Sequence, residues 1–184
     1  MSMYNGVAGN TTVKSRGRNM PRGPRKRKGA SAVEYRKYAG TCYIRMDRGD
    51  EIVAGILSVC AAEGISSAVF SGIGGCSEAE IQTFIPEEGR FETERLQGML
   101  ELVSLNGSVI QDERGGYYHH VHAMLAYKQG EAHCVAGGHI KSITVRYTAE
   151  IELRPVAGGV IRRKFDPETG TGFWDFGSVK NAAR

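Results

Sequence analysis

The feature that most constrains the fold is a succession of strand-like segments, separated by turn-forming residues, that begins near residue 65. Residues 86–89 and 128–131 are turn signals of this kind, each flanked by segments that contain β-branched and aromatic residues. Strands joined by such short turns pair as antiparallel hairpins. The glycine-rich residues 72–75 are predicted to form another turn, and Asn106-Gly107 a tight turn or a β-bulge.

One helix precedes these strands. Apolar residues recur at helical spacing from Ile52 to Cys60, Asp50 is the expected N-cap, and Gly64 is expected to end the helix. An early helix followed by hairpin-connected strands predicts an α+β fold, with a single domain over residues 34–176. Its sheet is expected to be mostly antiparallel and barrel-like, with flanking helices.

No apolar run reaches the roughly 18 residues that a membrane span needs, and the N-terminus lacks the apolar stretch of a signal peptide. The protein is therefore expected to be cytoplasmic, with no membrane partner. If it binds DNA, it is expected to be associated with the nucleoid.

The charge is distributed unevenly. The first 30 residues carry +8 and no acidic residue, and because the whole chain carries +4, the remaining residues carry −4. Residues 1–33 are predicted to be a basic disordered tail, and residues 177–184 a C-terminal tail. The expected DNA-binding residues are those of two imperfect Arg-Gly motifs and the basic run that follows: Arg16, Gly17, Arg18, Arg22, Arg25, Lys26, Arg27 and Lys28.

Arg16-Gly17-Arg18 resembles the core of an AT-hook, an arm that enters the AT-rich minor groove, although Asn19 stands where proline is expected. Two other interpretations remain open. The tail is either an arm that binds any polyanion through counterion release, or an extension without a role.

Histidines provide the main chemical signal. On a strand over residues 117–127, His120 and His122 would share one face, because side chains alternate, and His119 would lie on the other. Gly137-Gly138 would let the backbone bring His139 close to them. Three imidazoles with an open fourth position form a geometry that zinc accepts. We therefore predict a Zn²⁺ site at His120, His122 and His139, with His133 as an alternative third ligand.

Four ordered motifs resemble the plants-and-prokaryotes-conserved (PPC) domain. They are residues 47–53, the Ser-Gly-Ile-Gly segment at 71–74, residues 98–107, and the HxHA…GGH pattern that ends at His139. The resemblance extends over about residues 35–153. It implies an α+β fold, a homotrimer, and zinc at the three histidines. It also implies DNA binding and regulation, since plant members fuse this domain to an AT-hook.

The same histidine pattern and fold are similar to acetolactate decarboxylase, a zinc enzyme that acts on a small hydroxy acid. This similarity implies two alternatives to a DNA-binding regulator: a zinc-dependent enzyme and a small-molecule sensor, each acting on a small oxo or hydroxy acid. Glu101 and Arg146 are the candidates for handling protons and substrate charge. Residues 162–164 are expected to be a solvated basic run, and Phe165, Phe173, Trp174 and Phe176 are expected to pack the C-terminal segment onto the body or a neighbouring subunit.

Overall fold

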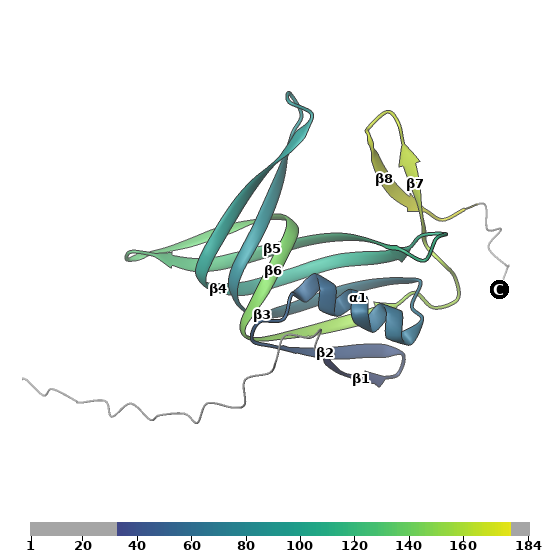
Figure 1. Cartoon of the computed structure of the whole chain (residues 1–184), viewed down its shortest axis with the longest axis horizontal. Helices are drawn as coiled ribbons and strands as arrows, with labels where there is room; N and C mark the ends of the chain where they lie inside the picture. Colours follow the sequence, from purple (N-terminus) through teal and green to yellow (C-terminus); the bar gives the residue numbers. More distant parts are fainter. Residues whose placement is uncertain (1–32, 178–184) are drawn as a thin grey trace, which may run out of the picture. The chain divides into compact units, whose positions relative to one another are not determined.

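A computed structural model describes residues 33–177 (Figure 1). The elements in chain order are β1 (Glu34–Tyr38), β2 (Thr41–Asp47), α1 (Ile52–Glu63), β3 (Ser67–Ile85), β4 (Arg90–Gln111), β5 (Tyr117–Gln129), β6 (Ala132–Pro155), β7 (Arg162–Asp166) and β8 (Thr171–Asp175). The predicted α+β fold is confirmed. All pairings between the named strands are antiparallel, and the described residues contain one α-helix.

The main sheet has the strand order β1-β2-β6-β3-β4-β5. In addition, β5 pairs with β6. The four long strands β3, β4, β5 and β6 therefore each pair with two of the others, as expected for a barrel-like arrangement. The sheet is not a closed barrel, because among the described strands β1 pairs with β2 alone and leaves an edge. The β7 and β8 strands form a separate two-stranded sheet.

The two faces of the sheet differ in their exposure to solvent. The helix α1 lies against one face of the sheet (Figure 1). It buries Ile52, Ile56 and Val59 in the core that also contains Leu105 and Leu125 from the strands. On the opposite face, apolar side chains remain in contact with solvent. Tyr43, Ile73, Val103 and Met124 are 48–57% exposed. We call this second face the open face.

The ends of α1 follow from local hydrogen bonding. Glu51, rather than the predicted Asp50, is the N-cap, and its carboxylate accepts from the Ala54 N–H at 2.6 Å. Asp50 instead closes the preceding turn, where it accepts from the Asp47 N–H at 2.9 Å. Gly64 ends the helix in the left-handed conformation with φ 63°, as predicted. With 12 residues, the helix of the described region is too short to cross a bilayer.

Two predicted turns are wrong. Residues 72–75 remain within β3, with register shifts after Gly72 and after Gly74 in place of a turn. Asn106-Gly107 lies inside β4, and both residues are paired in regular register. The glycines are needed for close packing instead. A Cβ at Gly74 would lie 2.6 Å from the Thr148 carbonyl oxygen, and one at Gly107 would lie 2.6 Å from that of His120.

Candidate metal centre

The strand β5 places two histidines on the open face. Val121 and Leu125 alternate with them and are fully buried in the core, whereas His120 and His122 are exposed. The period-two alternation that the sequence predicts is therefore present on this strand.

His139 comes from β6, where the strand lies between two neighbours. Its Cα partners are His122 on β5 and Gln82 on β3. The preceding glycines permit this approach: a Cβ at Gly137 would lie 2.5 Å from the Ala123 carbonyl oxygen, and Gly138 has φ 156°, which L residues rarely adopt. The double glycine thus allows β6 to bring His139 directly opposite His122.

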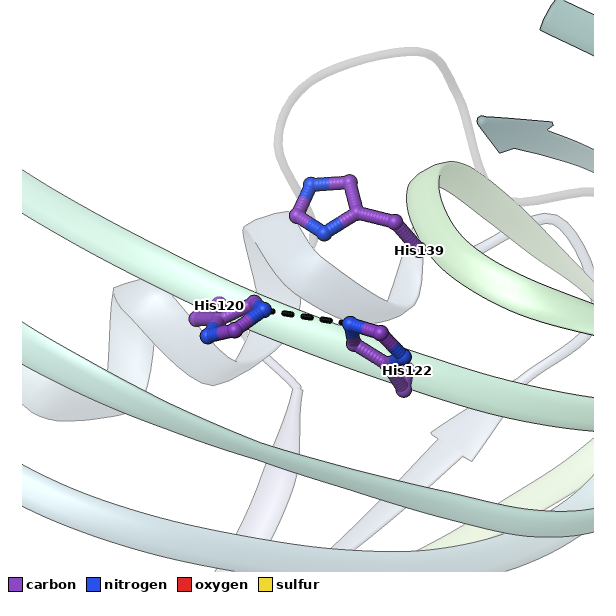
Figure 2. A group of neighbouring side chains, drawn as sticks. All are labelled: His120, His122 and His139. Atoms are coloured by element: carbon purple, nitrogen blue, oxygen red, sulfur yellow. Dashed lines mark hydrogen bonds between the residues drawn. The ribbon is translucent and has the colours of Figure 1, made fainter. Parts of the chain in front are cut away.

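The three imidazole rings converge on one small space, as Figure 2 shows. The Nε2 atoms of His120 and His122 are 3.1 Å apart, and one ring nitrogen from each of the three histidines lies within 4.8 Å of the others. Two nitrogens bound to one tetrahedral zinc at roughly 2.0–2.1 Å lie about 3.3 Å apart. Small side-chain rotations would therefore bring all three nitrogens to bonding distance from a single ion.

The surroundings favour neutral imidazoles. Burial lowers the pKa of His122 below its ordinary value of 6.5, and the neighbouring His120 lowers it further. Burial also lowers the pKa of His139, followed by the effects of His120 and His122. A neutral ring offers a nitrogen lone pair to a metal, so the lowered pKa values of His122 and His139 favour coordination at neutral pH.

The other sequence candidates lie elsewhere. His133 pairs with Lys128 at the far end of the β5–β6 hairpin and is not part of the cluster, so the structure favours His139 over the alternative third histidine. Glu101 and Arg146 do not line the two pockets that contain cluster histidines. The residues Arg16 to Lys28, predicted to bind DNA, lie outside the described part of the chain.

Sequence reasoning missed the surroundings of the cluster. The Phe91 ring lies 5.9 Å from the His139 ring, measured between centroids. Ser108 on β4 is the Cα partner of His120. Arg163, expected to be part of a solvated run, places its guanidinium 4.6 Å from the centre of the Tyr118 ring. The alternation of β7 and β8 hints at a face with both Arg163 and Trp174, but where that face packs depends on the tertiary fold.

Comparison with known proteins gives relatives of known structure, while no curated protein matches the chain. A plant- and prokaryote-conserved (PPC) protein from Pyrococcus horikoshii is 31% identical with a TM-score of 0.65, covering 78% of this chain and 94% of that one. A metal-containing protein from Archaeoglobus fulgidus is 30% identical with a TM-score of 0.64, covering 78% and 98%. A candidate DNA-binding protein from Bacteroides thetaiotaomicron is 21% identical with a TM-score of 0.72, covering 79% and 99%.

The family model of the Plants and Prokaryotes Conserved (PCC) domain matches residues 33–156, which include β1 to β6 and all three clustered histidines. The C-terminal hairpin of β7 and β8 lies beyond that match. From its fold, its relatives and this match, the chain belongs to the Plants and Prokaryotes Conserved domain family.

Proposed function

We propose that His120, His122 and His139 bind one zinc ion, and that the domain uses this centre to bind a small oxo or hydroxy acid. The observation that carries the proposal is the convergence of three imidazole nitrogens within 4.8 Å. Three neutral nitrogen ligands leave zinc an open coordination position for an oxygen donor. The archaeal relative at 30% identity is described as a metal-containing protein, which supports a metal in this chain as well.

Ligand sensing agrees better with the lining residues than catalysis does. When bound, zinc would supply Lewis-acid attraction for carboxylate, carbonyl or hydroxyl oxygens. Proton transfer needs a second group at the reacting atoms. Among the described residues, no aspartate or glutamate lines either pocket that contains a cluster histidine. A sensor needs no such carboxylate, whereas an enzyme would have to transfer protons through His119 or Tyr118, which line the second pocket.

The test is a zinc titration of the purified full chain, with metal content measured by atomic emission and affinity by competition with a chromophoric chelator. We expect one zinc per chain. His122→Gln should weaken binding by about a hundredfold or more, because a three-ligand site loses one of its donors. His133→Gln, a histidine outside the cluster, should leave affinity unchanged. Equal affinity in both variants would refute the assignment.

A second function is carried by the N-terminal charge. We propose that the basic tail binds DNA, since residues 1–30 carry +8 against −4 for the rest of the chain. Lysine and arginine contacts to phosphate release counterions and give salt-dependent affinity. The likeness to the Bacteroides protein, at 21% identity, concerns the fold alone, so this proposal rests on charge.

Fluorescence anisotropy with a labelled duplex at low and moderate salt tests the tail. Replacing Arg25, Lys26, Arg27 and Lys28 by glutamine should weaken binding and reduce its dependence on salt, because fewer phosphates are neutralised. The His122→Gln protein serves as a matched control with an intact tail, and its DNA affinity without added zinc should equal that of the original chain. An unchanged affinity after the fourfold replacement would disprove tail-mediated binding.

We further propose that the protein is a homotrimer that buries part of the open face. Its support is the half-exposed apolar row that includes Ile73 and Val103, both lining one shallow groove. Light scattering coupled to gel filtration should give a mass of three chains. Ile73→Glu should dissociate the trimer, whereas Val160→Glu, at an exposed valine that does not line this groove, should not. A monomeric original protein would refute the trimer.

A further inference from the structure

The C-terminal hairpin, β7 and β8 with their connecting turn, reaches the neighbourhood of the histidine cluster although it lies beyond the family match. Two contacts hold this segment against the main sheet. Directly before β7, the Ile161 N–H donates to the Ser67 hydroxyl at 3.3 Å, and within β7 the Arg163 guanidinium lies 4.6 Å from the centre of the Tyr118 ring. The hairpin is therefore held against β3 at Ser67 and against β5 at Tyr118.

The hairpin covers one end of the open face. Ser108 and Ile110 lie on the same face of β4 as the exposed Asn106, because side chains alternate along a strand. They are nevertheless only 8% and 6% exposed. Both line a cavity together with residues of β8. Residues of β4 and β7 also lie close together, which places the hairpin over this part of β4, next to His120, whose Cα partner is Ser108.

The covered region retains a cavity of about 430 Å³. Its lining includes His120 and His139 of the cluster, Phe91 and Tyr118 from the sheet, and Arg163 and Trp174 from the hairpin. Pockets of roughly 300–1,000 Å³ hold small molecules in many proteins. The volume here suits a compact ligand that reaches the proposed zinc ion from the hairpin side.

The charge of this cavity selects an anion. Arg163 supplies a cation, and among the described residues neither an aspartate nor a glutamate lines the cavity or forms an ion pair with Arg163. Gly172 leaves the space that the guanidinium occupies, because a Cβ at that position would collide with it. A zinc ion at the histidines would add further positive charge.

The aromatic side chains that line the cavity favour a ligand with a planar group. The Trp174 indole and the Phe91 ring are both about half-exposed, 46% and 50%, so their faces can still take up a ligand. Trp174 is the direct cross-strand partner of Arg163, which places an aromatic ring and a cation side by side on the hairpin. Aromatic side chains bind planar apolar groups by stacked or edge-to-face contacts.

We infer that the C-terminal hairpin makes the histidine centre specific for a small aromatic carboxylate. A carboxylate oxygen binds the zinc, Arg163 stabilises the anion, and the ring lies against Trp174. The inference rests on the proposed zinc centre. It adds that the bound acid carries an aromatic ring, which this chain recognises through a segment outside the family match.

The test uses the zinc-loaded full chain and three probes: benzoate, acetate and benzyl alcohol. Acetate has the carboxylate without the ring, and benzyl alcohol has the ring without the charge. Trp174 is the only tryptophan of the chain, so its fluorescence reports directly on this cavity. Titration calorimetry and the visible absorption of the cobalt-substituted protein give independent binding curves. Benzoate is expected to bind at least about tenfold more tightly than either comparator.

Two arginine variants separate the inference from simple charge effects. Arg163→Gln should weaken benzoate binding about tenfold to a hundredfold, the range for a lost charge-assisted hydrogen bond. Arg162→Gln makes the same change at the adjacent residue, which does not line this cavity, and should have little effect. Trp174→Leu, followed by calorimetry, should weaken benzoate several-fold more than acetate.

The outcomes of these experiments distinguish failure of the zinc centre from failure of the ligand assignment. If the chain takes up no zinc, the proposed zinc centre fails, and the ligand assignment fails with it. If zinc binds but benzoate gains nothing over acetate, or Arg163→Gln and Arg162→Gln behave alike, the ligand assignment alone is overturned. Selective benzoate binding that depends on zinc, Arg163 and Trp174 supports both.

Discussion

The two faces of β5 show how this domain divides stability from chemistry. On one face Val121 and Leu125 are fully buried in the core, and on the other His120, His122 and Met124 are exposed. Neighbouring residues thus contribute to different properties. Burial of the first set supplies folding free energy, whereas the second set is free to carry ligands and partners. The site can therefore be altered without loss of the fold.

The largest expected effect tests this division on adjacent residues. Leu125→Ala should lower the free energy of unfolding by about 2–5 kcal/mol, because a fully buried leucine leaves a cavity. Met124→Ala, at a residue that is 48% exposed, should lower it by less than about 0.5 kcal/mol. Urea denaturation followed by circular dichroism measures both. Similar losses at the two positions would mean that the open face contributes to the core after all.

A smaller effect comes from metal binding. Zinc at about a hundred times its dissociation constant should stabilise the protein by about 2.7 kcal/mol, since it binds only the folded state. His122→Gln should abolish most of this gain, while its stability without metal should stay close to that of the original chain. Thermal unfolding with zinc and with a chelator gives the difference. A gain that persists in His122→Gln would place the metal elsewhere.

The smallest effect concerns pH in the metal-free protein. His122 and His139 have pKa values lowered from 6.5, so the unfolded chain binds more protons just below pH 6.5. Stability should therefore fall as the pH drops from about 6.5 through the lowered values, and rise again on return. Glu63 also has a lowered pKa, through hydrogen bonds from Lys37 and Tyr35, but its contribution is lost below pH 4.5.

Urea unfolding between pH 4.5 and 7 isolates the histidine contribution. In the double variant His122→Gln/His139→Gln, this part of the profile should flatten, while the decline at lower pH remains. If the free energy of unfolding changes equally with pH between pH 5 and 6.5 in both proteins, protonation of these two histidines does not destabilise the fold.

The pattern of turns and alternation was enough to predict much of the fold. The helix from Ile52, its end at Gly64 and the turn at residues 86–89 are all present. Local signals failed at Gly74 and Gly107, because glycine is favoured both in turns and where two backbones approach closely. Only the position of a neighbouring strand distinguishes these two uses, and that position is not encoded locally.

The sequence by itself determined that His120 and His122 share a face, since the alternation of a strand is a local property of its backbone. It also determined that a double glycine precedes His139. The tertiary structure decided that His139, rather than His133, lies opposite His122, because strand register is set by long-range pairing. In the same way, it alone placed Arg163 and Trp174 beside the cluster, through packing of the C-terminal hairpin against strands that precede it in the chain.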